Sequence, residues 1–169
     1  MSLEKLPDTA RLWIFGATEP LTGAQRDALD ADLTGFVRTW AAHGSSLMAA
    51  HAILFDTFVV VAVDESVHGA SGCSIDAMAR HLAELEATLD VTLLDGARIW
   101  YRTGGGDIVS CERSEFRDRS GQGEIDAETR VFDPTIQTLG EIRDGSLERP
   151  AGESWHARLL VASGTAPGA

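Results

Sequence analysis

The heptapeptide TFVVVAV, Thr57–Val63, decides how the fold of this chain is organised. It is apolar and mostly β-branched, which favours a strand, and it lacks the alternation of a strand with one face in water. Strands with such continuous apolar runs are covered on both faces. The sequence therefore predicts a buried strand here, with both of its faces covered.

The stretch before it, Ser46–Phe55, is predicted to be a second strand, joined to the first by a tight connection at Asp56 and Thr57. The stretch after it predicts a loop over 64–73 and then a helix over 74–90. The helix rests on an apolar stripe at helical spacing, formed by Ile75, Met78, Leu82, Leu85 and Leu89.

Further out, Arg11–Phe15 is a short apolar run that predicts a strand. Thr22 and Gln25 form a capping-box pattern, so a helix is expected over 23–42, closed by His43 and Gly44. Ala97–Arg102 predicts one more strand.

The resulting order is βαββαβ, which is the ferredoxin-like pattern. We therefore expect an α+β protein with a ferredoxin-like core at 8–103, in which the first and third strands are central. A smaller α/β extension is expected at 107–160, followed by a disordered tail at 161–169. Its elements are predicted as strands at 107–111 and 129–132, helices at 113–121 and 134–143, and a loop at 144–154.

Composition restricts the partners. The chain has 169 residues and a net charge of −12, and its only lysine is Lys5. Such a surface repels nucleic acid and anionic lipid. No apolar run is long enough to cross a membrane, and the first residues lack a secretory pattern. Two cysteines, Cys73 and Cys111, form no disulfide framework, so a cytoplasmic location is expected.

The sequence GASGCSID at 69–76 is the strongest candidate for a functional site. Cys73 lies at the start of a predicted helix, where the helix dipole favours a thiolate. His68 supplies a base in the same loop. The residues that could hold a ligand are small or carry hydroxyl groups: Ser66, Gly69, Ser71, Gly72 and Ser74.

Three carboxylates oppose this interpretation, because Asp64, Glu65 and Asp76 would repel an anion and disfavour a thiolate. The alternative is a packed strand-to-helix turn in which Ser74 caps the helix and Cys73 is a small buried residue.

A second patch, Glu153–Arg158, contains Trp155, His156 and Arg158. One interpretation is that His156 or Arg158 completes a site together with the 64–76 loop. The other is that Trp155 anchors the C-terminal segment in a surface groove.

Several known motifs are absent. A phosphate-binding P-loop needs a lysine that this region lacks, and G-x-S-x-G does not occur. There is no C-x-x-C or H-E-x-x-H, so we expect neither a metal nor a cofactor.

The strings VDESVHGASGCSID (63–76), TRVFD (129–133) and ESWHARLL (153–160), with WIF (13–15), resemble a family of short bacterial proteins over about residues 7–160. Members are commonly labelled "ABC transporter ATPase", a label that no Walker or signature motif supports here. The resemblance implies a bacterial, cytoplasmic protein, and it carries over no catalytic residue.

Two functions remain. The first is a non-catalytic ligand-binding or regulatory module, whose partner is a small molecule, a protein or a second copy of the chain. The second is a small enzyme or thiol-dependent binding protein, with Cys73 as nucleophile and His68 or His156 as base.

Overall fold

The computed structural model describes residues 2–161, and the chain divides into two compact units. Among the described residues, the first unit consists of 2–96 and 134–147, and the second of 97–133 and 148–161. Both contain helices and strands, so the protein belongs to the α+β class. The division differs from the expected boundary near 103–107, because residues 97–102 lie in the second unit and 134–147 return to the first.

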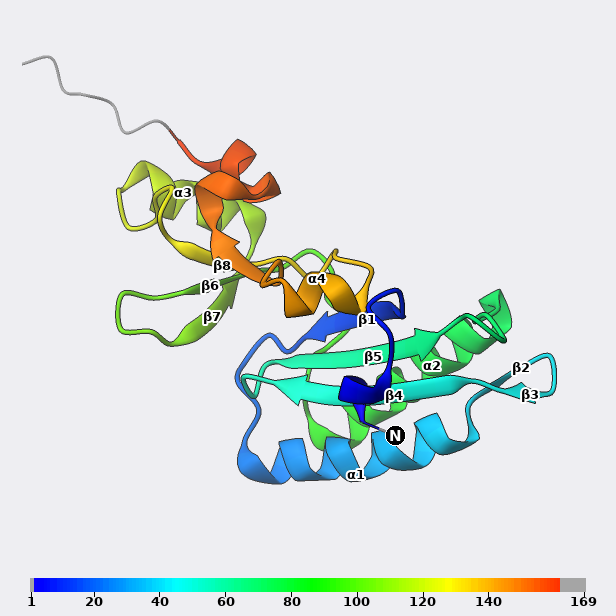
Figure 1. Ribbon diagram of the computed structural model, residues 1–169. Helices are drawn as coiled ribbons and strands as arrows, with labels where there is room; N and C mark the ends of the chain where they lie inside the picture. Colours follow the sequence, from blue (N-terminus) through cyan, green and yellow to red (C-terminus); the bar gives the residue numbers. More distant parts are fainter. Residues whose placement is uncertain (1, 162–169) are drawn as a thin grey trace, which may run out of the picture. The chain divides into compact units, whose positions relative to one another are not determined.

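The first unit contains a three-stranded antiparallel sheet in the order β1-β5-β4 (Figure 1). Its strands are β1 (Arg11–Gly16), β4 (Met48–Leu54) and β5 (Phe58–Asp64). The prediction from TFVVVAV is confirmed, since β5 is the central strand and every residue from Phe58 to Val63 is fully buried. β1 lies at one edge, although the ferredoxin-like pattern places it in the centre.

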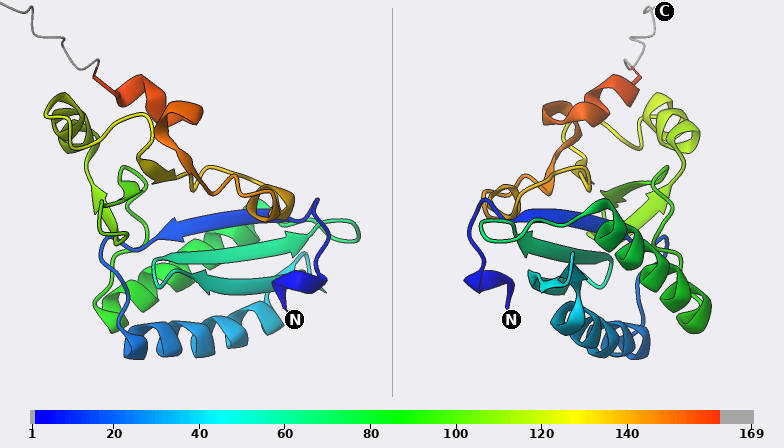
Figure 2. Two further views of the ribbon diagram at one scale, coloured as in Figure 1. Left: turned by 60° about the vertical axis from the view of Figure 1, so that its left-hand side comes forward. Right: turned by 90° about the vertical axis from the view of Figure 1, so that its right-hand side faces the viewer.

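Two helices cover one face of this sheet, as Figures 1 and 2 show. They are α1 (Gly23–Thr39) and α2 (Gly72–Leu89). Side chains of α1 and α2 form one core with alternate residues of β5: Leu29, Leu33, Met78, Leu82, Val59, Val61 and Val63. The capping box predicted at Thr22 and Gln25 is present at the start of α1.

The first helix ends at Thr39, earlier than expected, because the chain enters a small hairpin. Its strands are β2 (Ala41–Ala42) and β3 (Ser45–Ser46). His43 and Gly44 form the turn with φ angles of 51° and 81°. Left-handed backbone at both central positions is what a two-residue hairpin requires, so these residues turn a hairpin and do not close a helix.

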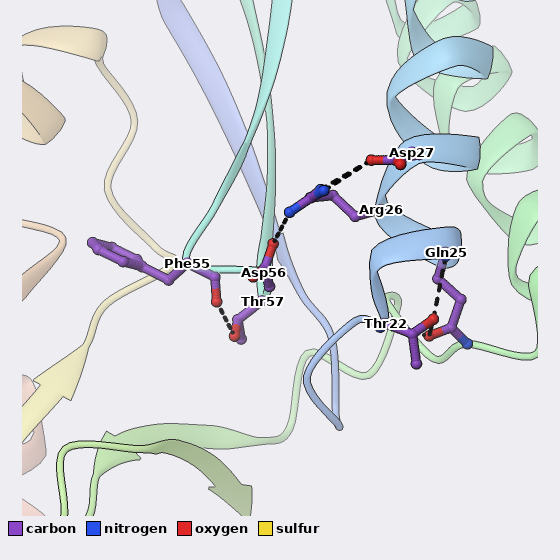
Figure 3. Close-up of polar contacts among 7 residues, drawn as sticks. All are labelled: Thr22, Gln25, Arg26, Asp27, Phe55, Asp56 and Thr57. Carbon is purple, nitrogen blue, oxygen red and sulfur yellow. Dashed lines mark hydrogen bonds and ion pairs between the residues drawn. The ribbon is translucent and has the colours of Figure 1, made fainter.

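The turn between β4 and β5 is built from two non-glycine residues with positive φ, Phe55 at 55° and Asp56 at 49°. The Thr57 N–H donates to the Leu54 carbonyl at 3.0 Å, which closes the turn. Arg26 of α1 also bonds the Asp56 carboxylate at 3.3 Å (Figure 3). The helix therefore helps to hold a turn whose backbone is strained.

The second unit contains a four-stranded antiparallel sheet in the order β7-β6-β8-β9. Its strands are β6 (Ile99–Arg102), β7 (Ile108–Cys111), β8 (Arg130–Phe132) and β9 (Glu148–Pro150). The helix α3 (Arg113–Gly121) has the predicted bounds, and two 3-10 helices follow β9, η2 (Ala151–Glu153) and η3 (Trp155–Leu159).

The strand order is not ferredoxin-like. The strand expected to complete the first sheet, β6, instead pairs with β7 and β8 in the second sheet. Both edges of β6 are therefore taken, and neither is left for β1. The turn after β6 is tight, since the Thr103 N–H bonds the Asp107 carbonyl and Gly106 takes a φ of 92°. A hairpin closed this tightly makes β7 the partner of β6.

The predicted helix over 134–143 is shorter, and only α4 (Leu139–Arg143) is helical. Thr138 and Glu141 form a capping box, and hydrogen bonds from Gln137 and Thr138 lower the pKa of the Glu141 carboxyl. The preceding residues 134–138 are outside any helix and run beside β1. The expected loop at 144–154 contains β9 and η2, and a short 3-10 helix, η1 (Leu3–Lys5), opens the described chain.

None of the helices in residues 2–161 is long and apolar enough to cross a membrane.

Candidate functional site

Cys73 is exposed at the second position of α2. The alternative prediction, that Cys73 is a small buried residue, is therefore wrong. Within residues 2–161, the thiol has neither a hydrogen bond nor an ion pair. His68 is also exposed and likewise makes no such contact in the described chain. Cys73 and His68, the expected nucleophile and base, are thus close in sequence, but no hydrogen bond links them in the described chain.

The start of α2 is capped by Ser71 and not by Ser74. The Ser74 N–H donates to Ser71 Oγ at 3.2 Å, and the Ser71 N–H donates to Ser74 Oγ at 2.8 Å. The Trp40 indole also donates to the Ser74 carbonyl at 2.8 Å. Ser71 and Ser74, two expected ligand-binding residues, therefore have structural partners.

Carboxylates of the loop occupy two of its own amides. The Ala70 N–H donates to Glu65 Oε1 at 3.0 Å, and the Ser66 N–H donates to Asp64 Oδ1 at 2.9 Å. An incoming anion would have to displace these groups. Gly69 lies against the Glu65 side chain, whereas Gly72 has open space where a Cβ would be.

His156 lies in the second unit and is fully buried. Its Nδ1 is 2.8 Å from Ser154 Oγ, and its Nε2 has no hydrogen-bond partner among the described residues. Burial lowers the pKa of the imidazole to about 4, so the ring is neutral at pH 7. A sealed ring of this kind has no access to an external substrate.

The neighbours of His156 hold it in the core of that unit. The Trp155 ring stacks on it with centroids 3.8 Å apart, and Arg113 lies 5.4 Å from the centre of the Trp155 ring. Arg158 is exposed and donates to the Trp155 carbonyl. His156, Trp155 and Arg158 thus belong to one unit, whereas Cys73 and His68 belong to the other.

A pocket of about 490 Å³ lies in the first unit beside β1. We call it the β1 pocket. It is lined by β1, by residues 134–138 and by Glu65 of the 64–76 loop, with Thr9 completing the wall. The sequence alone does not reveal this pocket, because its two sides are more than one hundred residues apart in the chain. Glu65 is the one residue of this pocket that belongs to the 64–76 loop, which was a candidate site for its cysteine and its small residues.

Backbone geometry determines what this pocket presents. The Leu12 N–H donates to the Gln137 carbonyl at 2.9 Å, so Leu12 points its polar groups away from β5. Hydrogen-bonding direction alternates along an antiparallel strand. Ile14 therefore also points its N–H and C=O away from β5, and within residues 2–161 neither group has a partner.

The segment 134–138 follows β1 only at one end. Arg11 and Thr138 form an isolated antiparallel bridge, and the Leu139 N–H bonds the Ala10 carbonyl. The Gln137 N–H then turns to the Glu141 carboxylate at 3.0 Å, and Pro134 has no N–H to offer. The two segments separate at this point, which leaves the β1 pocket open beside Ile14.

The side chains around the β1 pocket are aromatic and charged. The Arg11 guanidinium lies 4.8 Å from the centre of the Trp13 ring, and its Nη1 is 3.6 Å from Glu65 Oε1. Trp13 and Phe15 are half-buried. The lining includes no cysteine or histidine, so it has neither a thiol nucleophile nor an imidazole base.

A pocket of about 550 Å³ in the second unit is less suited to a ligand. Arg102, Arg119 and Arg130 line it, but each guanidinium is already bonded to a glutamate. Glu148 is shared by Arg102 and Arg130, and the Arg102 hydrogen bond lowers the pKa of its carboxyl. These pairings neutralise the arginines that an anion would need.

Residues 2–161 contain no group of three His, Cys, Asp or Glu side chains placed to hold a metal ion. Comparison with known proteins adds no assignment, since no family model, no curated protein and no solved structure matches the chain.

Proposed function

We propose that the protein is a non-catalytic binding module that holds its ligand in the β1 pocket. The observation that carries this proposal is the unpaired N–H and C=O of Ile14 at the wall of that pocket. An edge strand whose N–H and C=O have no protein partner can pair with an extended ligand. The lining offers recognition groups without a thiol or imidazole for catalysis.

The cellular setting belongs to the same proposal. Two free cysteines favour a reducing compartment, and the resemblance to short bacterial proteins favours the bacterial cytoplasm. The acidic composition argues against nucleic acid as the ligand.

The proposal can be tested by amide NMR of the full chain with cocktails of small organic fragments. We expect the fragments to shift the amides of Trp13, Ile14 and Thr138 together, because these residues line one pocket. Hits that cluster at the start of α2, or no hits along β1, would overturn the proposed site.

A second candidate is favoured by the exposure of Cys73 at a helix N-terminus. In that case the thiol itself contacts the ligand. Fragment binding that is lost in a folded Cys73→Ser variant would support the thiol-dependent function. Binding that is unchanged in this variant and maps to β1 would exclude it.

A further inference from the structure

The edge of β1 has the geometry of a strand-addition site. Strands at a sheet edge present N–H and C=O groups that pair with an extended segment of another chain. In this unit, residues 137–139 already pair with β1 at Ala10 and Leu12, so this edge can accept an added strand. The pairing stops at Ile14, where the β1 pocket begins.

The size of the opening limits what can enter. Residues Leu12–Phe15 line one wall, and an extended chain rises about 3.3 Å per residue. Three or four extended residues would therefore span this wall. A segment in this position would give hydrogen bonds to Ile14, and alternate side chains would reach the half-buried Trp13 and Phe15 rings.

The charge of the first unit indicates the charge of the segment that it would bind. The first unit holds 16 of the 26 acidic residues of the chain but only 6 of its 14 basic residues. Arg11 and Glu65 both line the pocket, and Glu65 Oε1 lies 3.6 Å from Arg11 Nη1 and accepts from the Ala70 N–H. The preference for a cationic ligand therefore comes from the net negative charge of the whole unit. An acidic surface attracts cationic partners and repels anionic ones.

We propose that the β1 pocket binds an extended basic peptide segment of a partner protein, which pairs with β1 at Ile14 and places an apolar side chain on Trp13 and Phe15. This inference rests on the proposed function, because it names the ligand class of the same pocket. Lysine or arginine side chains of the segment are attracted by the net negative charge of the first unit, and apolar side chains alternate with them.

The probe is a phage-displayed pool of random octapeptides, selected on the immobilised full-length protein. We expect enrichment of sequences in which apolar residues alternate with lysine or arginine. Their binding should weaken as sodium chloride is raised, because the attraction is electrostatic in part. Enrichment of acidic sequences, or none above an uncoated surface, would overturn the inference.

Two variants locate the binding. Ile14→Pro removes the outward N–H of β1 without removing a bond to β5, and edge strands tolerate proline at such positions. Thr135→Trp fills the pocket from the opposite wall and leaves β1 intact. Each should weaken the selected peptides at least tenfold. Clones that bind both variants as well as the wild type would show that the site lies elsewhere.

The matched control is Ile53→Pro on the opposite edge strand. By the same alternation through β5, Ile53 also points its N–H outward, but it lies outside the β1 pocket. We expect this variant to bind the peptides like the wild type. Circular dichroism of all three variants identifies any that fails to fold, and the remaining pocket variant still decides the outcome.

Two further outcomes separate the proposals. If fragments bind the β1 pocket but no peptide is enriched, the binding function stands and the peptide inference fails. If sedimentation shows a dimer of the free protein that Ile14→Pro dissociates, the pocket is filled by a second copy of the chain and the inference is again overturned.

Discussion

His156 Nδ1 lies 2.8 Å from Ser154 Oγ in the core of the second unit, while Nε2 of the same ring has no partner among the described residues. The ring is fully buried and stacked on Trp155. A neutral imidazole can be accommodated in this way, but a protonated one needs a second hydrogen-bond acceptor. The stability of this unit should therefore depend on pH.

The first prediction concerns the stability of the second unit at acidic pH. Burial lowers the pKa of His156 from 6.5 to about 4, with Asp133 opposing the shift and Arg113 adding to it. Above pH 6.5 the ring is neutral in both the folded and unfolded states. Between pH 6.5 and 4 the unfolded state binds the proton more readily. The free energy of unfolding therefore decreases by up to about 3 kcal/mol as the pH is lowered through this range.

Urea unfolding followed by tryptophan fluorescence at pH 7 and pH 4.5 measures this loss. A His156→Gln variant is the control, because its side chain does not titrate. If both proteins lose stability equally over this range, the burial of His156 is not the cause.

The second prediction concerns the strained turn. Phe55 has a φ of 55°, where most residues other than glycine are disfavoured, whereas asparagine is tolerated because its short polar side chain can hydrogen-bond locally. Phe55→Ala loses the ring and keeps the strain, so it is the matched reference. We expect Phe55→Asn to be about 1 kcal/mol more stable than Phe55→Ala in urea unfolding. Equal midpoints would mean that the turn is not strained.

The third prediction concerns close packing. A Cβ added to Gly152 would lie 3.0 Å from the Ala127 Cβ, next to a hydrogen bond from the Gly152 N–H to the Ala127 carbonyl. Gly152→Ala should destabilise the second unit by about 1–3 kcal/mol, as overpacking usually does. Gly72→Ala is the control, because nothing lies within 4 Å of its new Cβ. A thermal midpoint unchanged in both variants would contradict the predicted clash.

The fourth prediction concerns the two thiols. Cys73 is exposed, whereas Cys111 is buried and its pKa is raised to about 11 by that burial. Maleimide at pH 7 should label Cys73 in the native protein and Cys111 only after unfolding. Peptide mass spectrometry separates the two sites, with Cys73→Ser as the control. Rapid native labelling of Cys111 would show that the second unit opens readily.

The fifth prediction concerns the edge of β1. The Ile14 N–H points away from β5, whereas the Trp13 and Phe15 N–H groups face it. Native hydrogen exchange should therefore be faster at Ile14 than at Trp13 and Phe15, since the latter are held in the ladder. Equal protection of all three amides would indicate that Ile14 has a partner and that the pocket edge is closed.

The sequence determined the local elements, because their signals are carried by neighbouring residues. The apolar run Thr57–Val63 predicted the central strand, and Thr22 with Gln25 predicted the first cap. Helix α3 was predicted at its observed bounds. These features depend on periodicity and capping, which are local physical properties of the chain.

Only the tertiary structure decided how the elements pair. The ferredoxin-like order failed because β7 and β8 take both edges of β6. Residues 134–138 lie beside β1 without forming the expected helix. The free energy of strand pairing depends on contacts between two segments, so neither segment alone determines its partner. For the same reason the sequence selected Cys73 and the 64–76 loop, whereas the unpaired edge at Ile14 became visible only once strand neighbours and hydrogen-bond directions were known.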